Sequence, residues 1–143
     1  GGARMTKARS AVLAALDSAT EPLSAAGVVA MVGSSCDQAT VYRALHYLED
    51  AGLSESFVLY CSEHGVERYY ASRKSAHRHW FHCESCHRFI DLGACRIGGI
   101  VADVERDMGL KVTKHTMYLS GICAECTRRG SARRCEASIQ TAP

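Results

Sequence analysis

Two pairs of cysteines, Cys83/Cys86 and Cys123/Cys126, constrain the fold of this chain more than any other feature of its sequence. Each pair has the Cys-x-x-Cys spacing, at which a single turn of backbone presents two thiolates to one metal ion. Structural Zn²⁺ is four-coordinate and tetrahedral, so the two turns must meet in space to bind one ion. The spacing therefore predicts a closed structural zinc site. The two alternatives, a pair of disulfides or unrelated free thiols, agree less well with this spacing.

Length and composition leave room for one compact unit or two small lobes. With 143 residues, of which 47% are hydrophobic, each of two lobes would be marginally stable without a crosslink, and zinc supplies one. No apolar run approaches the ~18 residues of a membrane span, and no charged-then-apolar leader is evident, so we expect a cytoplasmic protein without a membrane partner. In a reducing compartment we expect free thiols at the other cysteines, Cys36, Cys61, Cys95 and Cys135.

The net charge of +2 conceals an asymmetry between the two halves of the chain. Residues 1–72 hold five Lys/Arg against eight Asp/Glu, a balance of −3, whereas residues 73–143 hold twelve against seven, a balance of +5. The total charge therefore does not decide whether the protein binds nucleic acid. The placement of individual cations is more informative, because Arg4, Lys7 and Arg9 cluster near the start of the chain.

The first half of the sequence predicts a winged helix-turn-helix domain over residues 1–72. Apolar residues recur at helical spacing in three segments, residues 9–16, 24–33 and 39–51. A polar turn at residues 34–38 precedes the third helix, which is the helix-turn-helix pattern. Residues 54–71 then place apolar and aromatic runs on either side of a Glu-His-Gly turn signal, which predicts a β-hairpin, the wing.

The third predicted helix has the composition of a DNA-recognition helix. Its apolar residues Val41, Leu45 and Leu48 fall on one face, and Ala39, Tyr42, Arg43 and His46 fall on the other. Arginine bonds guanine edges or phosphate, and a tyrosine ring packs against a thymine methyl. We expect DNA contacts from Lys7, Arg9, Thr40, Tyr42 and Arg43. The alternative is an ordinary solvated face whose tyrosine packs against a neighbouring domain.

The second half predicts a hinge at residues 73–76, an α/β dimerisation and metal-binding domain over residues 77–127, and a tail at residues 128–143. Alternation predicts strands at residues 77–83, 88–92 and 112–120, and helical spacing predicts an amphipathic helix at 97–108. A domain this small cannot cover both faces of its sheet, so we expect it to form a homodimer. The fold class is therefore α+β, a winged helix-turn-helix domain followed by a small α/β domain with a four-cysteine structural zinc site.

Four segments extend these motifs over nearly the whole chain. They are RMTKAR at residues 4–9, ATVYRAL at 39–45, His77-x-His79 leading into the first cysteine pair, and HTMYLSGICAEC at 115–126. In these segments the chain resembles the ferric uptake regulator (Fur) superfamily of bacterial metal-responsive repressors. The resemblance implies a repressor of metal-homeostasis or oxidative-stress genes that binds a pseudo-palindromic DNA operator as a dimer. It also implies a regulatory metal that sets the relative angle of the two DNA-binding domains.

The resemblance implies a sensor site near the hinge, and this chain departs from it. The corresponding positions are Glu21 or a neighbour, Tyr70, Arg78 and Trp80. Arginine and tryptophan are not ligands for Zn²⁺ or Fe²⁺, and the charge of Arg78 repels a cation. We therefore expect this sensor site to be lost.

A second regulatory site of the family, inside the dimerisation domain, is retained in part. The resemblance places three of its ligands at His77, His79 and His115, and its helix carboxylate falls on Gly98. Cys95 lies about one helical turn earlier, so we expect these three histidines and Cys95 to bind Zn²⁺ or Fe²⁺. Asp91 matches another acidic position and is expected to join the metal or orient a ligand. The alternative is a cluster of surface histidines that binds no metal.

Three other functions compete with a metal-dependent repressor. A zinc hydrolase or deaminase needs an open coordination position, which four thiolates do not leave, so we expect no enzyme activity. A thiol- or peroxide-responsive regulator is the stronger competitor, because four cysteines lie outside the predicted zinc site. A metal-independent DNA-binding protein with a degenerate sensor site is the third.

Overall fold

The computed structural model describes residues 4–74 and 76–130. The chain divides into two compact units, Gly1–Ala76 and His77–Pro143. The predicted hinge, residues 73–76, lies at the end of the first unit. Most of the predicted tail and Cys135 lie outside the described residues.

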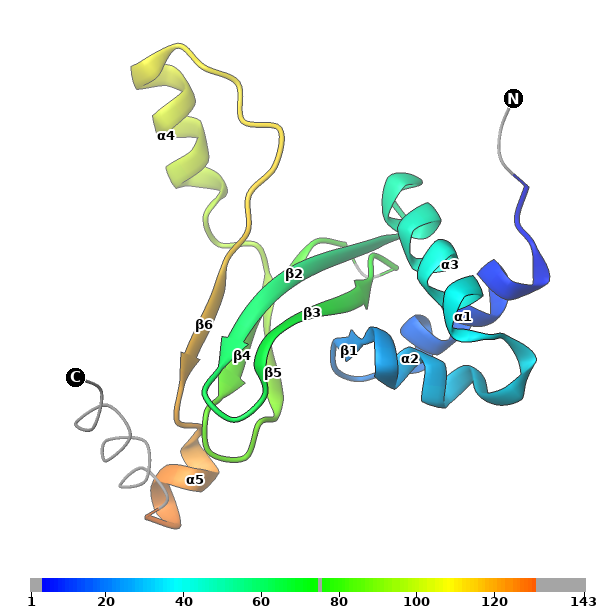
Figure 1. Ribbon diagram of the computed structural model, residues 1–143. Helices are drawn as coiled ribbons and strands as arrows, with labels where there is room; N and C mark the ends of the chain where they lie inside the picture. The colour runs from blue at the N-terminus through cyan, green and yellow to red at the C-terminus, as the bar shows by residue number, and fades with distance from the viewer. Residues whose placement is uncertain (1–3, 75, 131–143) are drawn as a thin grey trace. The chain divides into compact units, whose positions relative to one another are not determined.

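The first unit carries three helices, a 3-10 turn and a three-stranded sheet, coloured blue to green in Figure 1. Its elements are α1 (Lys7–Ser18), β1 (Leu23–Ser24), α2 (Ala25–Val32), η1 (Gly33–Ser35), α3 (Gln38–Asp50), β2 (Ser54–Cys61) and β3 (Gly65–Ser72). Each α-helix begins after a residue whose side-chain oxygen accepts a bond from a backbone N–H of the first turn. These capping residues are Thr6, Ser24 and Asp37.

The core of the first unit lies where the three helices meet. Its fully or almost fully buried side chains include Val12, Leu16, Val28, Val41, Leu45 and Leu48. Strands β2 and β3 form an antiparallel hairpin, and the short β1 pairs with the other edge of β3. Three helices with this hairpin make a winged helix-turn-helix, as the sequence predicted. Strand β1 was not predicted, because two residues are too few to show an alternating pattern.

The second unit consists of a three-stranded sheet and two helices, of which one precedes and one follows the last strand in the sequence. Its elements are β4 (Arg78–Cys83), β5 (Phe89–Ala94), α4 (Gly98–Met108), β6 (Tyr118–Gly121) and α5 (Ala124–Arg128). The strand order is β5-β4-β6, in which β4 is antiparallel to β5 and parallel to β6. The chain leaves the sheet after β5, forms α4 and returns to the opposite edge as β6 (Figure 1).

One predicted strand is much shorter than expected. The alternation at residues 112–120 predicted a strand over the whole segment, but only Tyr118–Gly121 forms β6. Pairing with β4 begins at Trp80 and Tyr118, and β4 itself starts at Arg78, so the preceding residues have little strand to pair with. Their alternating side chains instead include a histidine of the cluster described below.

Within the described residues, each helix is too short or too polar to cross a membrane.

Replacing Leu45 with alanine should destabilise the first unit by about 2–5 kcal/mol, because this fully buried side chain fills the space between the helices. Urea unfolding followed by far-UV circular dichroism, which reports mainly on helices, measures the change. The matched control is Met31→Ala in α2, where the side chain is 50% exposed and the change should stay within about 0.5 kcal/mol. Equal effects of the two substitutions would contradict this core.

Candidate metal centres and nucleic-acid interface

The four cysteines of the two Cys-x-x-Cys pairs converge at one end of the second unit. Cys83 ends β4, Cys86 lies in the turn after it, and Cys123 and Cys126 lie at the start of α5. Their sulfur atoms all lie within 4.8 Å of one another, and those of Cys86 and Cys123 are 3.9 Å apart. Sulfurs about 2.3 Å from a tetrahedral Zn²⁺ lie roughly 3.8 Å from each other. The cysteine quartet therefore has the dimensions of a zinc site.

Backbone N–H groups and burial shift the pKa values of the thiols in the cysteine quartet in opposite directions. The backbone N–H of Cys126 donates to the Cys123 sulfur, 3.5 Å away, and lowers the pKa of the Cys123 thiol to about 6. Burial raises the pKa of the Cys126 thiol to about 12. At neutral pH one thiol is therefore ready to bind a cation, while another must lose its proton when a metal binds.

A second group of potential ligands consists of three histidines and one cysteine, called here the histidine cluster: His77, His79, Cys95 and His115. The Nε2 atoms of the three imidazoles lie 2.9 to 3.2 Å from one another. The Cys95 sulfur lies 3.3 Å from the Nε2 of His79 and 3.4 Å from that of His115. Imidazole nitrogens about 2.0–2.1 Å from a tetrahedral Zn²⁺ lie roughly 3.4 Å apart. The spacing is slightly compressed but matches a four-coordinate site.

A hydrogen bond orients one imidazole of the histidine cluster. The Nδ1 atom of His79 lies 2.9 Å from the backbone carbonyl of Met117, so Nδ1 carries the proton that it donates to this oxygen. The Nε2 lone pair of His79 is then free to point at the other ligands. Metal-binding histidines are generally held in this way by a second hydrogen bond. The orientation of His79 is therefore the one expected of a metal ligand.

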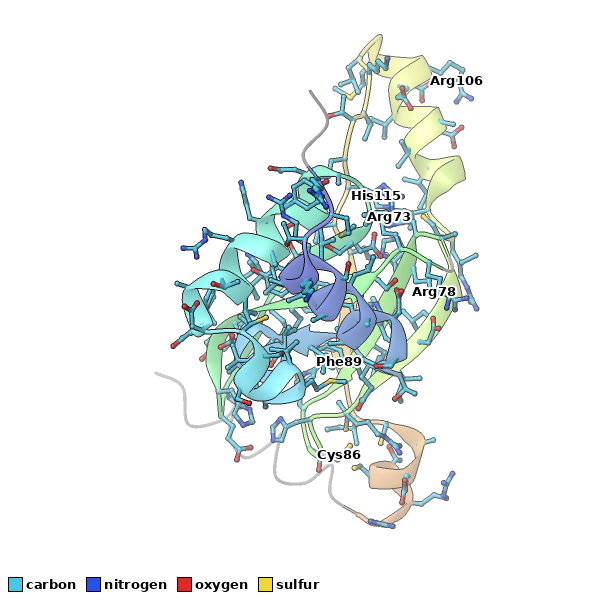
Figure 2. All side chains as sticks on the ribbon, turned by 90° about the vertical axis from the view of Figure 1, so that its right-hand side faces the viewer. Arg73, Arg78, Cys86, Phe89, Arg106 and His115 are labelled. Carbon is cyan, nitrogen blue, oxygen red and sulfur yellow. The ribbon has the colours of Figure 1, made fainter. Side chains whose placement is uncertain are left out.

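The two clusters occupy opposite ends of the sheet in the second unit. Figure 2 shows Cys86 next to α5, whereas His115 lies on the long segment that descends from α4. His79 and Cys83 lie four positions apart on β4, roughly 13 Å at the rise of a strand. One ion therefore cannot serve both clusters.

Asp91 is not among the residues that the structure brings together. It lies opposite Trp80 in the β4/β5 pairing, so its side chain points to the face of the sheet that carries Trp80, away from His79. Its carboxylate instead forms an ion pair with Arg78. Arg78, which the resemblance places at the position of a sensor ligand, is thus occupied by this ion pair. Cys95 does join the expected group, although it lies in the loop before α4, which begins at Gly98.

All five residues expected to contact DNA have exposed or partly exposed side chains, and Arg9 has a packing role as well. Tyr42 is 48% exposed on α3, and the Arg43 guanidinium donates to the Thr40 hydroxyl oxygen, 3.2 Å away. Lys7 is exposed in the first turn of α1. The guanidinium carbon of Arg9 lies 3.7 Å from the centre of the Tyr47 ring, a cation–π contact that joins α1 to α3.

Sequence reasoning overlooked Gln38, which is the first residue of α3 and is exposed. The N-terminal residues of a recognition helix are those nearest to base edges. Its position directly after the Asp37 cap is the signal that would have identified it.

Substitutions should remove the metal ions one at a time. Zinc-loaded protein, dialysed and analysed for elements, should hold two ions per chain, because the two clusters do not share ligands. The Cys126→Ala protein and the His115→Ala protein should each hold one zinc ion per chain. The control, Cys36→Ala, removes a cysteine outside both clusters and should keep two. A His115→Ala protein that retained both ions would contradict a metal site in the histidine cluster.

Comparison with known proteins supports one assignment. A family model described as the ferric uptake regulator family matches residues 1–120. The ferric uptake regulation protein of Campylobacter jejuni is 31% identical over 91 residues, which cover 64% of this chain and 55% of that protein. This chain thus spans little more than half the length of that relative.

Solved structures show the same fold. The Helicobacter pylori ferric uptake regulator, described with three functional metal binding sites, superposes with a TM-score of 0.65 at 24% identity, over 87% of this chain and 82% of that one. A zinc uptake regulator complexed with zinc and DNA superposes with a TM-score of 0.64 at 20% identity, over 90% and 86%. With its winged helix, cysteine quartet and a family match over most of its length, the chain belongs to the ferric uptake regulator family.

Proposed function

We propose that this protein is a metal-dependent DNA-binding transcriptional repressor that acts as a homodimer on a pseudo-palindromic operator. One observation carries the proposal: His77, His79, Cys95 and His115 form a complete four-ligand set in a chain whose other unit is a winged helix. Family membership supports the regulatory role. The regulated genes would be those of metal homeostasis or oxidative stress.

The exposed face of α3 supports DNA binding. The buried face of this helix is occupied by Val41, Leu45 and neighbouring apolar residues, so α3 is fixed in the first unit with Tyr42 and Arg43 pointing outward. A helix held in this way is suited to the major groove, where arginine reads guanine and the tyrosine ring contacts thymine. Lys7 lies at the start of the adjacent α1 and supplies a charge for the phosphate backbone.

The exposed apolar surface of the second unit supports a homodimer. No residue of α4 is buried, and Ile100, Val104 and Met108 form an apolar stripe along it, 64%, 38% and 71% exposed. Across the sheet, Ile90 and Leu119 lie opposite Phe81 in the strand pairing and are also exposed. Stable soluble domains bury such surfaces, and a second copy of this unit presents a matching one.

The ligand chemistry of the histidine cluster favours zinc as the regulatory metal. Three imidazoles and a thiolate are borderline to soft ligands, whereas Mn²⁺ prefers carboxylates and water. Fe²⁺ remains the second choice, since imidazole also suits iron. The zinc uptake regulator solved with zinc and DNA supports the link between this metal and DNA binding. A metal that binds the DNA-binding arrangement of the dimer more tightly than other arrangements raises the population of that arrangement.

A thiol-based response is the second candidate, favoured by the position of Cys95. This partly exposed thiol is a potential ligand of the histidine cluster, so peroxide that oxidised it to sulfenic acid would remove one of four ligands. Mass spectrometry after peroxide treatment separates this function from simple metal sensing. In that experiment, metal loss with Cys95 unmodified would exclude it.

Fluorescence anisotropy with an operator fragment tests the proposed function. Zinc should raise the DNA affinity of the wild type at least 10-fold, and His115→Ala should abolish this response while it keeps the cysteine quartet intact. Equal affinity with and without zinc would show metal-independent DNA binding and reject the proposal.

Arg43→Ala should weaken binding of zinc-loaded protein about 10- to 100-fold, because it removes a contact from the recognition helix. The matched control is Arg128→Ala, an exposed arginine of α5. Equal losses for the two variants would show that α3 does not make the specific contacts.

A further inference from the structure

Helix α4 has little within its own unit to hold it in place. None of its residues is buried, and it makes no extended packing contact with any other described helix or strand. Figure 1 shows it standing clear of the sheet to which it is joined. It begins with two glycines, Gly98 and Gly99, and no side chain caps its first turn. A short helix with glycine at its start and no packed face is only marginally stable in water.

The segments on either side of α4 each supply one ligand of the histidine cluster. Cys95 lies between β5 and α4, and His115 lies between α4 and β6. The Cys95 sulfur and the His115 Nε2 are 3.4 Å apart, so one ion bound to both would close the intervening chain into a loop. A crosslink of this kind removes conformational freedom from the segment that it closes. His77, directly before the central strand β4, and His79 within it would bind the same ion and fix the closed loop to the sheet.

We propose that the metal of the histidine cluster is the anchor of α4, so that its loss releases residues 96–114 while the rest of both units stays folded. The inference rests on the proposed function and adds where the metal acts. The exposed stripe of Ile100, Val104 and Met108 is then a regulated surface, offered to a second copy of this chain only while the loop is closed. The regulatory step is the assembly of this surface. A change in the angle between DNA-binding domains follows from it.

The positions of the ligands determine which part of the segment the metal would hold. No ligand of the histidine cluster lies within α4 itself, since Gly98 occupies the position of the helix carboxylate implied by the family resemblance. The metal therefore holds the ends of the segment and leaves the helix surface free for a partner. The cysteine quartet joins the end of β4 to α5 and has no ligand near α4, so its zinc does not replace the anchor.

Hydrogen–deuterium exchange of the full chain, read by mass spectrometry, tests the inference. Mild chelation removes the more weakly held zinc, and elemental analysis confirms that one ion per chain remains. Amides of Gly98–Met108 should then exchange at least 10-fold faster, whereas amides of Lys7–Ser18 in α1 should be unchanged. An unchanged rate in Gly98–Met108 would overturn the proposal.

Two variants separate the anchor from dimer formation. Ile100→Asp places a charge in the apolar stripe and should give a monomer, shown by sedimentation velocity. Zinc should still slow exchange in α4 of this monomer, and zinc protection found only in the dimer would overturn the proposal. Cys95→Ala should lose the protection, and Cys95→His, which restores a ligand, should regain it. Protection that persists in Cys95→Ala would also count against the anchor.

Parallel anisotropy measurements keep this inference distinct from the proposed function. Zinc-dependent DNA binding together with zinc-independent exchange in α4 would overturn the anchor alone. Zinc-dependent exchange in α4 with DNA affinity unaffected by zinc would support the anchor and overturn the metal-dependent repressor.

Discussion

Metal coordination organises the second unit, because its described residues contain almost no apolar core. The buried hydrophobic residues of that unit are Trp80, Cys83, Phe89, Cys123 and Cys126, and most of them are thiols of the cysteine quartet. The first unit differs, since branched aliphatic side chains from three helices meet in its core. Apolar burial stabilises one half of the molecule, whereas the other half has a cysteine quartet through which a bound ion would stabilise it. Under the proposed function, metal supply would act on the second half without unfolding the first.

Features set by short-range spacing were predictable from the sequence. The Cys-x-x-Cys pairs, the helical stripe of α3 and its end at Asp50, two residues before the positive-φ Gly52, all depend on neighbouring residues. Features set by pairing partners were not. The alternation at residues 112–120 resembles a strand, but the length of β6 depends on where β4 begins. Strand β1 exists only because β3 offers it an open edge.

The same distinction applies to the histidine cluster. Alternation over residues 77–83 predicts that His77 and His79 lie on one side of the chain, and this much follows from the sequence. The register between β4 and β5 decides the place of Asp91, and it pairs that residue with Trp80, on the face opposite His79. One face of β4 thus presents His79 of the histidine cluster, and the other carries the ion pair of Arg78 and Asp91. Knowing which residues form strands was not enough to place Asp91 and Arg78 on the face opposite the histidine cluster, because that placement depends on the register.

Cys123 performs two tasks with one atom. Its sulfur belongs to the cysteine quartet, and it also accepts the backbone N–H of Cys126 as the N-terminal cap of α5. Serine at this position would preserve the cap, because its oxygen also accepts such a bond, but would bind zinc poorly. Only a thiolate satisfies both demands. Substitution at this position would therefore disturb the cap of α5, the cysteine quartet or both, so the start of α5 cannot evolve independently of the proposed zinc site.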